Sequence, residues 1–583
     1  MTVERQQMNV DIVCAGFGPA TAGFLVTLGR AVSNADGTPR IESRVAPGLP
    51  LQVLCFERAD DFGAGVSGVV TRARGIRASF PDFQSAQIPL STRVTREKLV
   101  YLLDPIGASR RSRPLRVIDA ILRGAGRLVG MERGAVPLPF VPGFLQKHDG
   151  LVLSFGQFGQ WVSGQVMATG GAQIWPASPV AEPLLDGDRV TGVRLIDQGT
   201  DLQGAPAAGF TPGMDVSADL TVVGDGPVGA VGRALDARFG LPDEHVRDEW
   251  ALGMKMVIDL REGVDLERGT VLHTFGFPEP EIFGFLYVLA PRTASLGIFV
   301  PSWLHSPVRT GYRYLQHWMQ HPYLWRWLEG GTLRSWGAKS VQESGRRGEP
   351  HLAGEGYARI GEGSGSTNAL TGSGVDEAWT TGVQLAEAVI ELASRGDPFT
   401  KANLERTYVA RRRASWLDRE LRISEGARDG FERGVLWGLA GMGLTGLTRG
   451  ALRLPGRRRV RPLPPLEAYM SSDEYLDRRG WPSIPYDGRL LVTHQDALLM
   501  GGKVRAAPGY ADHVRFVNPT LCRDCWTRLC VAMCSGQAIT AASGEGVAFD
   551  REKCVHCGAC LWNCPSGNLE FRAGAGGLHS VEN

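Results

Sequence analysis

Two observations on this 583-residue chain predict an α/β (α+β) fold made of two kinds of domain. Near the start, NVDIVCAGFGPATAGFLVTLG (9–29) has the pattern of a strand, a glycine turn and a helix, which is typical of a Rossmann-like dinucleotide-binding unit. Near the end, eight of the ten cysteines fall between Cys522 and Cys564. Clustered cysteines in a chain without a recognisable signal peptide indicate metal ligation in a reducing compartment rather than a disulfide framework.

The overall composition is that of an ordinary globular protein and excludes few functions. Hydrophobic residues make up 43% and charged residues 21% of the chain, and the formal net charge is +2, so nothing indicates nucleic-acid binding. The first residues, MTVERQQMNV, contain no apolar or Arg/Ser-rich presequence, and we expect no targeting peptide. No apolar run reaches about 20 residues, so we expect no conventional transmembrane helix.

The first glycine turn is a candidate pyrophosphate site. Gly16 and Gly18 follow a strand and open a helix, where glycine lets the backbone approach a phosphate that the helix N-terminus stabilises. Glu57 ends the next predicted strand, 51–56, and is placed to accept hydrogen bonds from ribose hydroxyls. Thr21 occupies the third glycine position of the fingerprint. A glycine turn without a ligand stays open as an alternative.

A second glycine-rich loop lies at 360–374, after a predicted strand at 357–360 and before a helix from about Val375. It resembles the closing segment of the FAD site in group-two flavoproteins of the glutathione-reductase type, with Glu362 in place of Asp and Ala369 in place of Pro. The resemblance implies that Glu362 contacts the ribityl–phosphate region and that the helix N-terminus faces the isoalloxazine ring; a solvent loop is the alternative. The predicted FAD ligands are Gly16, Gly18, Glu57, Gly361, Glu362, Thr371, Gly372 and Gly374.

A third glycine run, 223–229, has no acidic ribose partner at a suitable strand end. We interpret it as the strand that returns to the FAD domain rather than as a nicotinamide site.

The cysteines form two similar runs. Cys554-x2-Cys557-x2-Cys560-x3-Cys564-Pro565 is the bacterial ferredoxin pattern, in which the fourth cysteine ligates the other cluster. Cys522-x2-Cys525-x4-Cys530-x3-Cys534 repeats it with a longer spacer. We therefore predict two [4Fe–4S] clusters, with structural zinc knuckles as the alternative. Cluster one takes Cys534, Cys554, Cys557 and Cys560, and cluster two takes Cys522, Cys525, Cys530 and Cys564.

An apolar, uncharged segment at 434–448 precedes an arginine cluster. As a helix it would be about 22 Å long, too short to span a membrane of about 30 Å, but suited to the surface of an anionic leaflet. A buried core helix is the alternative. The proline-broken piece 136–145 is a second candidate, as a dipping hairpin or a core loop. The arginines are Arg449, Arg453, Arg457, Arg458, Arg459 and Arg461.

In this order, the FAD motifs, the membrane segment and the ferredoxin motif resemble the electron-transfer-flavoprotein:ubiquinone oxidoreductase family, and also the Fix-type flavoprotein fused to its ferredoxin-like partner. Supporting markers are ERADDFGAGVSG (57–68), FPDFQSAQIPLSTRVT (80–95) and 321–345. The family typically holds one cluster, at positions matching the cluster-one set. Its quinone pocket lies near a glycine-aromatic strand, which Phe283, Gly284 and Phe285 resemble, although the preceding FPEPEI differs.

The predicted domains are an FAD-binding domain of the glutathione-reductase type with an interleaved quinone or substrate domain (1–430), a membrane-facing segment with a basic, proline-rich linker (431–511), and a bacterial-ferredoxin-like 4Fe–4S domain (512–583). The resemblance implies a flavin and iron–sulfur oxidoreductase that passes electrons from reduced electron-transfer flavoprotein, or a ferredoxin-type donor, through its cluster and FAD to a membrane quinone. We expect it to sit peripherally on the cytoplasmic face of a bacterial-type membrane.

Two other functions stay open. One is a geranylgeranyl-type reductase of prenyl lipids fed by the ferredoxin domain, and the other is a non-catalytic electron-carrier subunit. The sequence singles out no general acid or base, and it does not distinguish ubiquinone from menaquinone.

Overall fold

The structure is a computed structural model that describes residues 4–34, 36–62, 68–246, 249–304, 311–454, 472–501, 508–542 and 546–574. Part of the marker at 57–68, and Arg457, Arg458, Arg459 and Arg461, lie outside the described residues.

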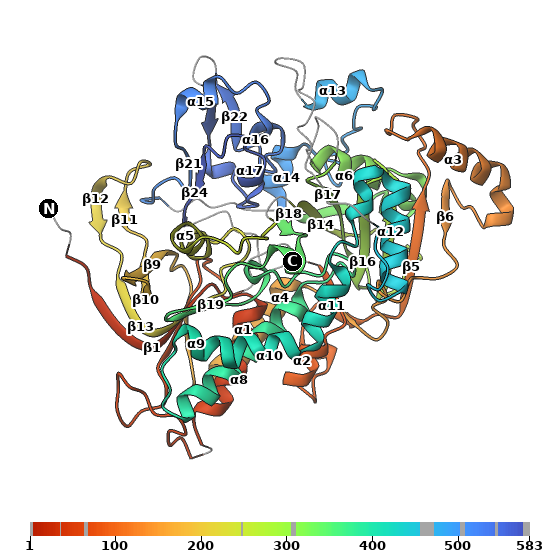
Figure 1. The fold of residues 1–583 in the computed structure, drawn as a ribbon. Helices are drawn as coiled ribbons and strands as arrows, with labels where there is room; N and C mark the ends of the chain where they lie inside the picture. Colours follow the sequence, from red (N-terminus) through yellow and green to blue (C-terminus); the bar gives the residue numbers. More distant parts are fainter. Residues whose placement is uncertain are drawn as a thin grey trace.

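The first sheet carries the Rossmann-like unit (Figure 1). β1 (Gln7–Ala15) pairs in parallel with β13 (Asp215–Val223) on one side and with β2 (Val53–Phe56) on the other. The last six residues of β1 are buried, and Ile12 and Cys14 pack in one core with side chains of α1 (Pro19–Val32) and α8 (Val375–Ser394). The strand order is β19-β20-β13-β1-β2-β8, with the antiparallel β10 and β9 attached to β13. The remaining strands are β8 (Gln173–Trp175), β9 (Val180–Asp186), β10 (Arg189–Leu195), β19 (Ala353–Gly354) and β20 (Tyr357–Arg359).

Helix α1 packs along α8. The contact is close because Gly382 lies against the Ala20 carbonyl oxygen, where a Cβ atom would meet it at 1.8 Å. The second glycine loop also lies close to this helix pair, because a Cβ atom on Gly361 would meet the Cβ of Ala20, at the start of α1, at 3.0 Å.

A second, seven-stranded sheet is built from chain segments that interrupt the first one (Figure 1). Its strand order is β18-β14-β17-β16-β15-β5-β6, and its core is packed by α6 (Gly311–Met319) and α7 (Pro322–Leu328). The predicted interleaving of the two domains is thereby confirmed. The strands are β5 (Arg96–Leu102), β6 (Ala135–Pro137), β14 (Trp250–Asp259), β15 (Thr270–Phe275), β16 (Phe283–Ala290), β17 (Thr293–Pro301) and β18 (Thr332–Gln342).

The cysteine-rich region folds into two small antiparallel ribbons and short helices. β21 (Val514–Phe516) pairs with β24 (Leu569–Phe571), and β22 (Ile539–Ala542) pairs with β23 (Gly546–Phe549). The helices are α15 (Pro519–Arg523), α16 (Leu529–Ala532) and α17 (Ala559–Trp562). The predicted α/β (α+β) class with a ferredoxin-like C-terminal domain is confirmed.

Part of the predicted linker is packed rather than free. Leu476, Trp481 and Leu490 are almost completely buried in the core of the second sheet. Leu476 lies on α13 (Ser472–Arg478) and the other two follow it, while α14 (His494–Gly501) contacts β18. The outer limits of the three predicted domains stay a prediction.

Candidate functional site

The turn before α1 has the shape that a pyrophosphate requires. Gly16 has φ +88°, and a Cβ atom there would lie 2.9 Å from the Gly224 carbonyl oxygen, so only glycine fits. Gly18 caps α1, and a Cβ atom on Gly18 would meet no described atom within 4 Å. The space in front of the helix N-terminus is therefore open, which fits the phosphates of FAD.

A pocket opens beside this turn. Its lining includes Gly18, Glu57, Phe62 and Phe158. The two carboxylate oxygens of Glu57 accept hydrogen bonds from the backbone N–H groups of Phe17 (2.7 Å) and Ala59 (2.9 Å). Each oxygen retains a second lone-pair direction, so the carboxylate is held in place and can still accept from a ribose hydroxyl.

The second glycine loop faces the same end of the sheet. Glu362 accepts from the Gln342 backbone N–H at 3.2 Å, and burial raises its pKa to about 7. The Asn368 side chain accepts from the N–H of Thr371 at 3.1 Å, and the buried Lys147 ammonium donates to the Thr371 carbonyl at 2.7 Å. Gly372 has φ +62°, and a Cβ atom on it would meet no described atom within 4 Å, so this turn also leaves room for a ligand before α8.

Lys339, on β18, is a site residue that sequence reasoning missed. Its neighbours include Glu57, Glu362 and Cys557, one from each of the predicted ribose, flavin and cluster motifs. Burial lowers the pKa of Lys339 to about 8, and Arg58 lowers it further, while the acidic groups act against this. The signal in the sequence is one lysine within the otherwise uncharged SWGAKSV.

The predicted cluster-two cysteines are neighbours in space. Burial raises the pKa of Cys530 to about 12, and the thiols of Cys564, Cys525 and Cys522 contribute to the rise in that order. Cys564 thus lies with the upstream run rather than only with its own sequence neighbours, as the crossover pattern requires.

The predicted cluster-one cysteines form the second group. Burial raises the pKa of Cys554 and Cys560 well above the usual range, and Cys557 and Cys534 add to both. The pKa of Cys534 rises to about 11, mainly by burial and then through Cys557.

Both groups fit iron ligation. Buried thiols packed against one another resist ionisation, and bound iron reverses this by stabilising the thiolates. Backbone N–H groups of Ala538 and Ile539 point at the Cys534 sulfur, at 3.1 and 3.3 Å, as donors to a thiolate would. The assignment of each cysteine to a cluster stays a prediction.

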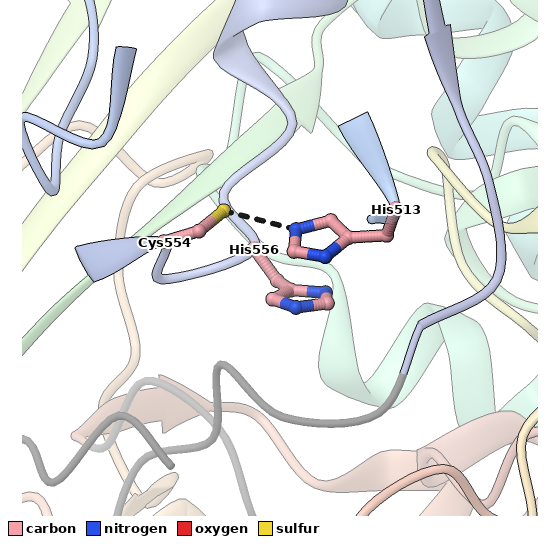
Figure 2. A group of neighbouring side chains, drawn as sticks. All are labelled: His513, Cys554 and His556. Atoms are coloured by element: carbon pink, nitrogen blue, oxygen red, sulfur yellow. Dashed lines mark hydrogen bonds between the residues drawn. The ribbon is translucent and has the colours of Figure 1, made fainter. Parts of the chain in front are cut away.

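Two histidines adjoin Cys554, one of the cysteines predicted for cluster one (Figure 2). His513 Nε2 lies 3.1 Å from Cys554 Sγ, and the His513 ring stacks on His556 with centroids 3.8 Å apart. Arg58, directly after Glu57, hydrogen-bonds to His556 Nδ1. The flavin domain therefore contributes a residue to the surroundings of the cluster.

The residues predicted to lie at the quinone site, Phe283, Gly284 and Phe285, are consecutive on β16, so they alternate between the two faces of the sheet. Phe285 stacks on Tyr287 at 4.6 Å, and the buried Lys255 ammonium lies 5.5 Å from the centre of the Phe285 ring. Gly284 faces α6 on the other side, where a Cβ atom would meet Trp318 at 2.4 Å. Gly284 is therefore required for packing, whereas Phe283 and Phe285 share the opposite face.

The two apolar segments lie together beside Phe283. The segment 434–448 forms α12 (Val435–Leu447), and Gly446 on α12 packs against Phe144 of the segment 136–145. Phe431, just before α12, meets Phe283 edge to face at 6.0 Å and stacks on Trp303 at 4.6 Å. Within the described residues, no helix is both long and apolar enough to cross a membrane.

The fold and this site define a flavin and iron–sulfur oxidoreductase. A family model described as "ETF-QO, ubiquinone-binding" matches residues 250–341, and a "4Fe-4S binding domain" model matches residues 547–569. The first match covers β14 through β18 and the second covers the Cys554–Cys564 run.

Similar proteins agree with these two matches. Electron transfer flavoprotein-ubiquinone oxidoreductase of Pseudomonas aeruginosa is 27% identical over 72% of this chain and 70% of its own length. A probable enzyme of the same name from Acinetobacter baylyi is 24% identical over 99% and 98%. The chain is thus related to the electron transfer flavoprotein-ubiquinone oxidoreductases, and the resemblance predicted from its motifs is confirmed. A solved geranylgeranyl bacteriochlorophyll reductase-like structure from Thermoplasma acidophilum has the same fold, with TM-score 0.53 and 14% identity over 77% of this chain and 93% of that one.

Proposed function

We propose that this chain accepts electrons from a reduced electron-transfer flavoprotein, or from a ferredoxin-type donor, and delivers them to a membrane quinone. The observation that carries the proposal is the edge of β18, where the Ser340 N–H donates to the Cys557 carbonyl at 2.8 Å and the Gln342 N–H donates to Glu362 at 3.2 Å, so that a cluster loop and the flavin loop meet on one strand. When bound, the clusters carry single electrons and the flavin exchanges one or two, which matches a one-electron donor to a two-electron acceptor.

The placement of the cysteines supports an order of transfer. Cys557 and Cys560 of cluster one are each 8% exposed and lie against the flavin and quinone domains. Cluster two lies farther out, beside the exposed apolar side chains of Leu521 (45%) and Trp526 (64%). We infer that the donor delivers electrons at cluster two and that cluster one passes them to the flavin.

The quinone end of the chain is the face of β16 beside α12. Phe283 lies next to Phe431 at the base of α12. The side of α12 that carries Trp437 (53% exposed) and Leu447 (80% exposed) faces outward, and Phe140 (63% exposed) belongs to the neighbouring apolar segment. A lipid-soluble quinone would reach Phe283 from a membrane surface that covers these side chains.

The test is stopped-flow oxidation of the anaerobically reduced protein. Reduced electron-transfer flavoprotein or reduced ferredoxin is the donor, and ubiquinone-1 or menadione is the acceptor. We expect Phe283→Ala to slow reoxidation by quinone while leaving reduction by the donor unchanged. Leu202→Gln is the matched control, in the turn between β11 (Gln198–Thr200) and β12 (Pro206–Thr211) on the opposite side of the molecule (Figure 1). Failure of every quinone to reoxidise the wild-type protein would refute the proposal.

The prenyl-lipid reductase stays the second candidate. The likeness to the geranylgeranyl bacteriochlorophyll reductase-like structure supports only a common fold at 14% identity. The same reduced protein, mixed with a geranylgeranyl lipid in place of quinone, separates the two functions, because only a reductase would saturate the double bond.

A further inference from the structure

His513 has no place in the function described so far, although it contacts a predicted cluster ligand. It lies directly before β21, 41 residues upstream of Cys554, outside both cysteine runs. Its side chain is almost fully buried, with 3% of the residue exposed. Figure 2 shows its ring pointing at the Cys554 sulfur, with Nε2 and Sγ 3.1 Å apart.

The direction of this hydrogen bond follows from the chemistry of the ligand. A thiolate bound to iron carries no proton, so the sulfur accepts and His513 Nε2 donates. Such a bond withdraws charge from the sulfur and favours the more negative, reduced cluster.

The ring of His513 is held on three sides. The rings of Phe549 and Phe571 meet it edge to face, at 5.2 and 5.4 Å, and His556 stacks on it at 3.8 Å. Arg58 of the flavin domain hydrogen-bonds to His556 Nδ1 and so fixes the stacked ring. The donor geometry is therefore set jointly by the cluster domain and the flavin domain.

We propose that His513 is a positioning residue of cluster one, which donates its Nε2–H to the Cys554 sulfur and raises the reduction potential of that cluster. The inference rests on cluster one of the proposed function, but not on any quinone. Cluster one is the neighbour of the flavin site. The hydrogen bond would therefore set the reduction potential of the centre that exchanges electrons with the flavin.

The test is an EPR-monitored redox titration of the intact, anaerobically purified protein. His513→Leu removes the donor, and we expect the midpoint potential of cluster one to become more negative while that of cluster two stays unchanged. His513→Gln retains an N–H donor and should largely restore the wild-type potential. Val517→Ala is the matched control, since it shortens an exposed side chain (53%) just after β21 in the same domain and touches neither His513 nor its ring contacts, and it should leave the potential unchanged.

Two outcomes would overturn the inference. One is an unchanged potential in His513→Leu with iron content equal to wild type, and the other is an equal shift in His513→Leu and His513→Gln. If His513→Leu does not fold, wild-type protein containing ring-¹⁵N histidine provides the measurement. Reduced cluster one should then show a hyperfine coupling to a histidine ring nitrogen, and absence of the coupling refutes the bond. Loss of the cluster signal in wild-type protein would instead refute the proposed function.

Discussion

The backbone N–H of Ser340 donates a hydrogen bond of 2.8 Å to the carbonyl oxygen of Cys557. Ser340 lies on β18, the edge strand of the second sheet, and no other described strand pairs with its outer side. Two residues further on, Gln342 donates from the same edge to Glu362. A strand edge is usually a row of unpaired polar groups; here it is covered by the cluster-one loop and the flavin loop, and this fixes their separation.

The two glycines of the first turn should respond differently to substitution. Gly18→Val places a side chain in open space before α1, so we expect an intact fold and roughly a tenfold or greater loss of FAD affinity, because the side chain fills the pyrophosphate position. Gly16→Ala forces a Cβ atom against the Gly224 carbonyl at φ +88°, and should lower the free energy of unfolding of the flavin-free protein by about 1–3 kcal/mol. Flavin content and thermal unfolding check both, and a Gly18→Val protein with full FAD would contradict the assignment.

Glu362 should make the stability of the flavin-free protein depend on pH. Burial raises its pKa from 4.5 to about 7 in the folded state, so the folded protein binds the proton more tightly than the unfolded chain. Stability is then lost as pH rises from about 4.5 to 7, by roughly 1–3 kcal/mol, and stays constant above that. Glu362→Gln keeps an acceptor for the Gln342 N–H and should remove this contribution. Denaturant unfolding at pH 5 and pH 8 is the measurement, and an equal pH dependence in both proteins would contradict the prediction.

The outward side chains of the two apolar segments should carry membrane binding. Replacing Phe140, Trp437 and Leu447 by Gln leaves the buried side of α12 intact but removes side chains worth up to about 1.5–3 kcal/mol each when buried. Sedimentation with anionic vesicles should fall at least about tenfold, with unchanged thermal stability. Leu202→Gln should bind like wild type. Equal binding by the triple variant would show that this face does not meet the membrane.

Two clusters per chain should be measurable as iron and sulfide. Anaerobically purified protein should contain about eight of each. The Cys564 thiol is a neighbour of Cys530. Cys564→Ala should therefore reduce the iron content to about four atoms per chain. The EPR signal of cluster one and the flavin content should stay unchanged. If the wild type contains about four iron atoms per chain and Cys564→Ala does not change this number, the protein holds a single cluster, as is typical of the family.

The sequence by itself determined the features that depend on short-range spacing. The glycine turn at 16–18, the helix beginning at Val375, the helix within 434–448 and the doubled cysteine pattern were all predictable, since turn geometry, helical periodicity and ligand spacing are properties of a few adjacent residues. The strand order of the second sheet could not be predicted, because pairing of strands far apart in the chain leaves no local pattern.

Only the tertiary structure decided which distant residues meet. It placed Lys339 among Glu57, Glu362 and Cys557, turned Gly284 toward α6 and away from Phe283, and brought His513 to Cys554. None of these contacts joins residues of one motif. They follow from the packing of the two sheets, α6 and the cysteine domain against one another, and close packing of separate elements specifies contacts that no single segment encodes.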